Sequence, residues 1–189
     1  MAIFLGTMTT GAFNLVMDRF LGIDESYLLT PLTKAHIVTG LIISGLMITT
    51  VISGIVLILS MAITSTPLFI GLHRLISILI VIVLTTLGLL SMMCVLMGRL
   101  NHPRVVGILS GFLNVILFFP SGAVYPIESF PGWLKTFSMI NPETYAVHAM
   151  KAILFKGASL SVVASDIVFL AAFTAVMLAL AIVAFKRTV

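Results

Sequence analysis

Long apolar runs, separated by short polar segments, set the pattern of this chain. No Asp, Glu, Lys or Arg lies between Lys34 and Arg74, Arg74 and Arg99, Arg104 and Glu128, or Asp166 and Lys186. A charge at the centre of a membrane helix costs about 3 kcal/mol, and a hydrocarbon core needs about 20 apolar residues per helix. Each gap is long enough for one span, so we predict membrane helices over residues 37–63, 75–98, 105–119 and 163–185.

A fifth apolar stretch, residues 2–17, is slightly short for a full span and has the character of the end of one. It lacks the basic start and the small-residue cleavage pattern of a signal peptide. A membrane β-barrel needs short strands that alternate apolar and polar residues, whereas these runs are apolar on all sides. The pattern predicts an all-α fold, a polytopic transmembrane helical bundle of about four full spans plus part of a fifth.

The first segment that is not a span covers residues 18–36 and mixes both signs of charge with a Tyr-Leu-Leu cluster. Asp24, Glu25 and Ser26 offer capping groups for a short helix, and Pro31 would end it. One interpretation is a helix across the membrane face that presents the Tyr-Leu-Leu side to a partner. The other is a plain amphipathic loop that rests in the headgroups.

The second such segment, residues 120–157, is rich in helix breakers. It holds four of the seven prolines, namely Pro120, Pro126, Pro131 and Pro142. The only tryptophan, Trp133, lies near Phe130 and Phe137. Proline breaks a straight helix, yet the segment is too apolar for a solvated loop. We predict broken helical pieces in the outer membrane interface, with aromatic residues at headgroup level and residues 142–155 as one piece.

Composition excludes a water-soluble or disordered chain. Of 189 residues, 60% are hydrophobic and 8% are charged, and the mean hydropathy is +1.27. A soluble domain carries about 25% charged residues, and disorder needs low hydrophobicity. The net charge of +4 reflects basic residues at the cytoplasmic ends of spans rather than a nucleic-acid partner.

Lys and Arg in short loops predict the orientation, because such residues stay on the cytoplasmic side. Arg99 and Arg104 bracket a short loop, and Lys186 and Arg187 close the chain. Placing both groups in the cytoplasm makes the C-terminus cytoplasmic. Residues 18–36 then lie on the same side, and residues 120–157 lie on the opposite, external side.

Residues for common enzyme chemistry are missing from the sequence. It contains no GxxxxGK[ST] phosphate loop and no HExxH or GxSxG motif. The histidines, His36, His73, His102 and His148, are scattered near predicted span ends without metal-ligand spacing. Asp166 is the one acid that we expect near the bilayer, at the rim of the last span. We therefore expect no metal site and no catalytic residues.

Small residues inside the predicted spans have two interpretations. Gly107 and Gly111 form a GxxxG pair, and alanines recur every fourth residue at Ala171, Ala175 and Ala179. Small residues let membrane helices approach closely, so the first interpretation is packing within the bundle and the second is a dimer seam. The lone Cys94 lies in an apolar run and indicates packing.

Residues 18–32 resemble the cytoplasmic motif of ABC-2 type permeases, the membrane subunits of ATP-binding cassette exporters. That motif runs roughly Asp-Arg-Glu-x-Gly-Thr-x-Glu-x-Leu-Leu-x-Thr-Pro. The matching positions are Asp18, Arg19, Gly22, Glu25, Leu28, Thr30 and Pro31. Phe20, Ile23 and Tyr27 depart from the motif without changing its register.

Residues 119–145 resemble the second motif of the same family, which has Ser-Gly, Tyr-Pro, Pro-x-Trp-Leu and Asn-Pro-x-x-Tyr in that order. Ten positions agree in order: Ser121, Gly122, Tyr125, Pro126, Pro131, Trp133, Leu134, Asn141, Pro142 and Tyr145. The resemblance implies one ABC-2 type transmembrane domain over residues 1–189. It implies six spans, so we expect this chain to begin inside the second span, without the N-terminal helix and first span.

The resemblance also implies a division of roles. The ATPase-coupling segment would be Asp18, Arg19, Gly22, Glu25, Tyr27, Leu28, Leu29, Thr30 and Pro31. The external gate, a re-entrant segment, would be Ser121, Gly122, Tyr125, Pro126, Pro131, Trp133, Asn141, Pro142 and Tyr145. The implied partners are an ABC ATP-binding subunit, which binds ATP and Mg, a second permease subunit and the bilayer of the cell membrane.

Three functions remain open at this point. The resemblance implies an exporter subunit that moves an amphipathic drug, lipid or glycan and binds no cofactor itself. The alternative is a truncated structural or assembly membrane protein without a transport path. A membrane-embedded enzyme would need a polar cluster inside the bilayer, and the charge pattern offers none.

Overall fold

The computed structural model describes residues 17, 34–63, 71–97, 100 and 102–186, and over these residues it contains helices and no strand. The predicted partial span over residues 2–17 lies outside this part, residue 17 excepted. All coupling-segment residues from Asp18 to Pro31 lie outside it as well. Their predicted positions and contacts stay predictions.

Four described helices are long and apolar enough to cross a membrane, as predicted. They are α4 (Lys34–Ile63), α5 (Leu72–Met97), α6 (Pro103–Phe118) and α9 (Ala164–Lys186). α6 has 16 residues and spans only about 24 Å at 1.5 Å per residue. The 3-10 turn η2 (Phe119–Ser121) continues it, so the apolar stretch runs from Pro103 to Ser121. The all-α polytopic bundle is confirmed.

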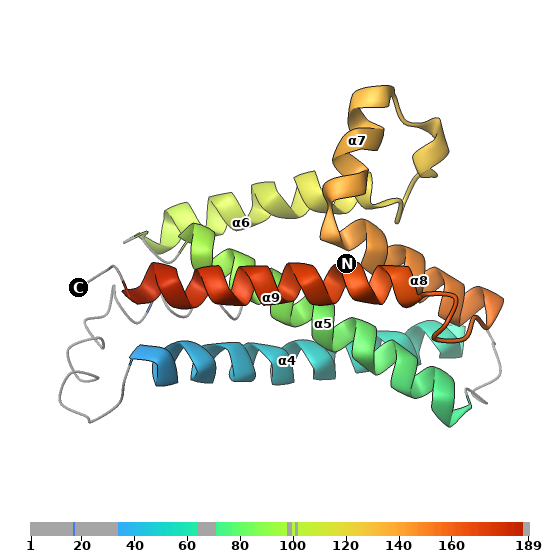
Figure 1. Cartoon of the computed structure of the whole chain (residues 1–189), viewed down its shortest axis with the longest axis horizontal. Helices are drawn as coiled ribbons and strands as arrows, with labels where there is room; N and C mark the ends of the chain where they lie inside the picture. The colour runs from blue at the N-terminus through green and yellow to red at the C-terminus, as the bar shows by residue number, and fades with distance from the viewer. Residues whose placement is uncertain (1–16, 18–33, 64–70, 98–99, 101, 187–189) are drawn as a thin grey trace.

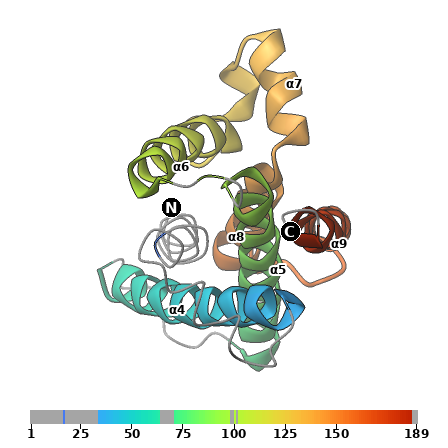
Figure 2. The same cartoon turned by 90° about the vertical axis from the view of Figure 1, so that its left-hand side faces the viewer.

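Helix α5 is the centre of the described bundle. Of its apolar stretch 67% is buried, against 22–28% for α4, α6 and α9. Figure 2 shows α5 between α4 and α9, and it also packs on α8 (Pro142–Lys156). One core cluster comprises Leu89, Met93, Met97, Val106 and Leu117, and a second comprises Ile78, Val81, Ile82, Ala146, Ala149, Ala152, Ile153, Val163 and Leu170. These clusters join α5 to α6 and to the α8–α9 pair.

The close approach of α5 and α9 depends on Gly88. A Cβ atom built there would lie 2.9 Å from Phe173 Cδ1 and 2.9 Å from Thr174 Oγ1. The Thr174 hydroxyl donates to the Leu84 carbonyl of α5 at 2.9 Å and to the Leu170 carbonyl of α9 at 2.7 Å. A glycine on one helix and a hydroxyl on the other therefore bring the two backbones together.

The small residues singled out from the sequence do not pack within the described bundle. A Cβ atom at Gly107 or Gly111 would meet nothing within 4 Å. Ala171, Ala175 and Ala179 are likewise exposed on α9. The packing interpretation of both patterns is wrong for the described residues. Residue spacing shows that small side chains share one helix face, but it does not show whether that face lies against another helix.

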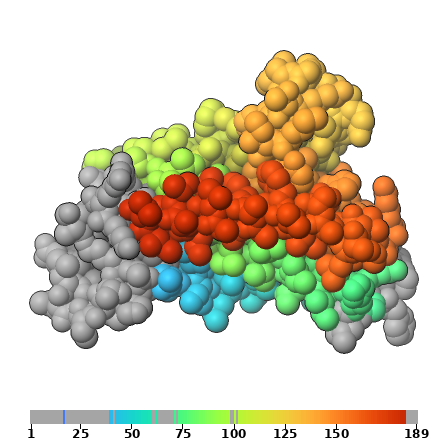
Figure 3. Space-filling model, viewed as in Figure 1, coloured from blue at the N-terminus to red at the C-terminus, as the bar shows by residue number. Residues whose placement is uncertain are grey.

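Two shorter helices, α7 (Gly132–Ile140) and α8, fill the proline-rich segment between α6 and α9. In Figure 1 the chain leaves α6, forms a projecting loop with η3 (Ile127–Ser129) and α7, and returns along α8. Figure 3 shows the projecting part standing out from the bundle surface. The predicted broken helical pieces are confirmed, and the piece expected over residues 142–155 is α8.

Candidate functional site

The candidate site begins where α6 ends and the chain turns. Ser121 Oγ donates to the Phe118 carbonyl at 2.6 Å. Gly122 follows in the left-handed conformation, with φ of 78°, which L side chains rarely adopt. A Cβ atom there would also lie 3.0 Å from the Ile127 side chain. The Ser-Gly pair thus stops the helix and turns the chain away from its axis.

Asn141 joins the start of α8 to the end of α6. Its side chain is 2% exposed. The Nδ2 group donates to the Leu117 carbonyl at 2.6 Å, and Oδ1 accepts from the Glu143 backbone N–H at 3.0 Å. Pro142 occupies the first helical position of α8, where its missing N–H costs nothing. The Asn-Pro pair therefore starts α8 and anchors it.

Two further bonds reach the same turn from other helices. The buried Ser138 of α7 donates to the Pro120 carbonyl at 2.7 Å. Lys151 Nζ of α8 donates to the Gly122 carbonyl at 2.6 Å. The Pro120 carbonyl belongs to η2 and the Gly122 carbonyl to the residue that ends it, so these bonds hold α7 and α8 to the turn that follows α6.

The structure places the predicted gate residues in two groups, with Tyr145 apart from both. Ser121, Gly122, Asn141 and Pro142 are buried together around the turn. Tyr145 lies further along α8, where its ring stacks on Phe169 of α9 with 3.8 Å between ring centroids and its hydroxyl donates to the Met139 carbonyl at 2.7 Å. The second group lies exposed on the projecting part and comprises Tyr125, Pro126, Pro131 and Trp133.

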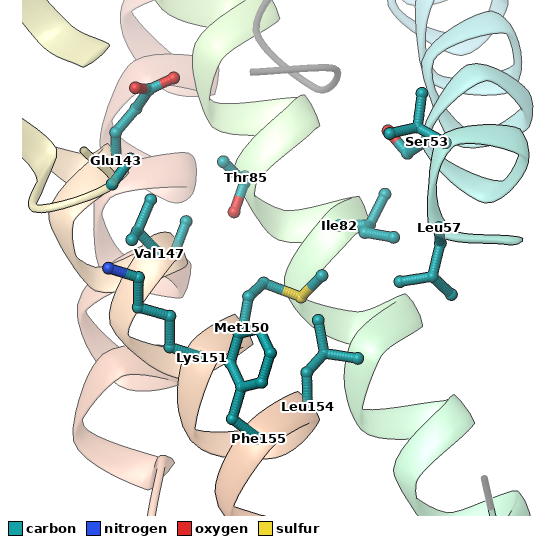
Figure 4. Close-up of a pocket in the computed structure, with 13 residues that line it drawn as sticks. Ser53, Leu57, Ile82, Thr85, Glu143, Val147, Met150, Lys151, Leu154 and Phe155 are labelled. Atoms are coloured by element: carbon teal, nitrogen blue, oxygen red, sulfur yellow. The ribbon is translucent and has the colours of Figure 1, made fainter. Parts of the chain in front are cut away.

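A cavity of about 300 Å³ lies between α4, α5 and α8 (Figure 4). Its walls are mainly apolar side chains, among them Leu57, Ile82 and Met150. Glu143 also lines it and is 6% exposed, nearly as buried as Asp166. Besides Asp166, the described residues thus contain a second buried acid, Glu143, which the charge pattern did not indicate.

The sequence of this chain is similar to those of known membrane transporters. A model of the ABC-2 type transporter family matches residues 1–155, a range that includes both motifs and most of the candidate site. The chain belongs to the ABC-2 type transporter family. The resemblance found in the two motifs is thereby confirmed.

Two curated relatives of this ABC-2 chain have the same description, "Probable multidrug ABC transporter permease YbhR". They come from Escherichia coli strain K12 and Escherichia coli O157:H7, and each is 27% identical over 188 residues. The alignment covers 98% of this chain and 50% of each relative, so the chain spans about half the length of these relatives. No solved structure matches it.

Burial raises the pKa of Glu143 from 4.5 to about 7, because the charged form loses hydration in the apolar cavity. Its helix α8 is not one of the four candidate spans. The folded protein then holds a proton that the unfolded chain releases at lower pH. The contribution of Glu143 to the free energy of unfolding should be largest below pH 4.5 and should fall by about 2 kcal/mol between pH 5 and 7.

Glu143→Gln should remove this pH dependence, because glutamine stays neutral. The measurement is the melting temperature of both proteins in detergent at pH 5, 6 and 7. The difference between them should change by about 4–8 °C across this range. Glu128→Gln removes an exposed carboxylate of η3 and is the control. Parallel melting curves for wild type and Glu143→Gln would show that the buried carboxyl does not titrate in this range.

A histidine–aspartate pair joins α8 to α9 in this chain. His148 Nδ1 lies 2.7 Å from Asp166 Oδ2, across the hairpin that joins the two helices. Asp166 stands in the first turn of α9, at the rim of the span as predicted. This pairing was not predictable from the sequence, because the two residues come from separate helices. Among the described residues, no group of three potential ligands could hold a metal ion.

Proposed function

We propose that this chain is a membrane subunit of an ATP-driven exporter that moves an amphipathic drug, lipid or glycan out of the cell. The family match over residues 1–155 carries the proposal, since it takes in both the coupling segment and the segment after α6. ATP and Mg would bind to a separate ATP-binding subunit, and this chain would hold no cofactor. Its place would be the cell membrane, with the C-terminus in the cytoplasm.

The ATP-binding subunit would act on residues 18–31, with Glu25, Tyr27, Leu28 and Leu29 as the contact surface. Closure of that subunit on ATP would push the segment and move the spans attached to it. Two permease subunits would enclose the path. The smooth, exposed face of α6 around Gly107 and Gly111 supports such a pairing.

The segment from Ser121 to Tyr145 would form the external gate. Its rigid part would be the buried turn held by Asn141, Ser138 and Lys151. Its movable part would be the projecting η3–α7 region, whose side chains are largely exposed. A rigid base under an exposed tip is the arrangement that lets a gate open without unfolding the helices that carry it.

Glu25→Arg tests the coupling role. The reversed charge should repel the surface that binds Glu25, so export with the partner ATPase should fall at least tenfold while insertion in the membrane is unchanged. The measurement is transport into inverted vesicles together with the rate of ATP hydrolysis. Glu25→Asp, which keeps the negative charge at the same position, is the control. Unchanged export by Glu25→Arg would contradict the coupling role.

A further inference from the structure

The cavity between α4, α5 and α8 contains polar atoms that have no partner. Ser53 Oγ, Thr85 Oγ1 and Glu143 Oε2 are buried and make no hydrogen bond within the described part of the chain. Their residues are 6%, 3% and 6% exposed. Leaving a buried polar atom unpaired costs about 1–3 kcal/mol, so three such residues lining one cavity call for an explanation.

These residues come from three different helices. Ser53 belongs to α4, Thr85 to α5 and Glu143 to α8, and all three line the same cavity. Figure 4 shows Glu143 at one end of the cavity, with Thr85 and Ser53 on the facing helices. No single helix places its polar side chains here by its own sequence. They come together only because the three helices pack around one cavity. A few polar groups among apolar walls are typical of a ligand-binding site.

The chemistry of the lining indicates what the cavity can take. Its volume of about 300 Å³ is at the lower end of ligand pockets. Side chains such as Ile82, Val147, Met150 and Leu154 supply an apolar surface. Above its pKa of about 7, Glu143 is a carboxylate that accepts hydrogen bonds and attracts a positive charge, and hydroxyls accept as well. We propose that this cavity binds a small amphipathic amine, with its apolar body against α5 and α8 and its ammonium group on Glu143.

Lys151 lines the same cavity without opposing this charge. Its amino group is bound to the Gly122 carbonyl at 2.6 Å, and Figure 4 shows it pointing away from Met150. The methylene stem is the part left to contact a ligand. Lys151 is the only other charged residue among the described ones that line the cavity, so Glu143 determines the sign of the ligand.

The proposed binding site rests on the proposed exporter function only in the claim that the amine is a transported substrate. Binding itself requires this chain alone. A binding measurement without the ATPase therefore fails or succeeds independently of transport, and co-purification with an ATP-binding subunit tests the transporter separately.

The experiment measures binding of three probes that share one apolar body: 4-phenylbutylamine, 4-phenylbutanol and 4-phenylbutyrate. Saturation-transfer NMR on the full chain in nanodiscs at pH 8, where Glu143 is ionised, gives each affinity, and empty nanodiscs give the lipid background. We expect the amine to bind at least tenfold more tightly than the alcohol, and the carboxylate to bind most weakly. Equal affinities of amine and alcohol, or tighter binding of the carboxylate, would overturn the proposal.

Two variants locate the binding. Glu143→Gln keeps the shape of the side chain and should lower amine affinity at least tenfold while leaving the alcohol unchanged. Thr85→Val should lower amine affinity about threefold and provides a second readout should the first variant fold poorly. Glu128→Gln, outside the cavity, is the control and should bind as wild type. Unchanged amine binding in Glu143→Gln, or in Thr85→Val where that variant stands in for it, would place the amine elsewhere and refute the assignment.

Discussion

Gly88→Leu is expected to destabilise the bundle by about 3 kcal/mol, the upper part of the usual range for overpacking. A Cβ atom alone would lie 2.9 Å from Phe173 Cδ1 and from Thr174 Oγ1, and leucine adds three more carbons. To make room, α9 must move away from α5. That movement also breaks the bond from Thr174 to the Leu84 carbonyl. The melting temperature in detergent should fall by about 6–12 °C.

Gly107→Leu is the matched control for this prediction. The same side chain is added to an α6 position where a Cβ atom meets nothing within 4 Å. Leucine favours a helix over glycine by somewhat under 1 kcal/mol, so the melting temperature should hold or rise slightly. Equal losses from both variants would mean that Gly88 does not set the distance between α5 and α9.

Asn141→Ala is expected to cost about 3 kcal/mol, because it leaves two buried backbone groups without partners. The Leu117 carbonyl loses the Nδ2 donor, and the Glu143 N–H loses its Oδ1 acceptor. The turn at the end of α6 would then separate from the start of α8. Thermal unfolding in detergent measures the loss, and limited proteolysis of the η3–α7 region measures the loosening.

Asn141→Asp separates the loss of the bond to the Leu117 carbonyl from the loss of the bond to the Glu143 N–H. The aspartate keeps an acceptor for the Glu143 N–H but has no donor for the Leu117 carbonyl, so α8 should still start while its anchor to α6 is lost. Ser129→Ala is the control, because it removes a side-chain bond of 2.7 Å to the Pro126 carbonyl that is exposed to water. A loss from Asn141→Ala no larger than that from Ser129→Ala would show that the turn is held by other contacts.

The spans and the broken segment were predictable because their causes are local. Charges are excluded from the bilayer core, so the gaps between charged residues mark α4, α5, α6 and α9. Prolines remove backbone donors, so their crowding marks the breaks around α7. The motif residues around the turn were also predictable, and the bonds of Asn141 give them a physical role.

Contacts between helices were not predictable in the same way. Gly107 and Gly111 were predicted to serve bundle packing or a dimer seam, yet among the described residues Gly88 is the glycine that lies at the α5–α9 crossing. Neither Glu143 in its cavity nor His148 beside Asp166 was predictable from the sequence. Each of these depends on how a helix is rotated about its axis, which residue spacing does not specify when all faces are apolar.

By itself the sequence determined that this chain has helices apolar enough to cross a membrane, where along the chain they lie, and which family its motifs indicate. Those properties follow from the free energy of moving each residue from water to lipid, a sum over local positions. Only the tertiary structure decided which glycine lies at a helix crossing and which polar side chains meet in one cavity. Such juxtapositions arise from packing between distant segments, where shape and contact, rather than hydrophobicity along the chain, select one arrangement.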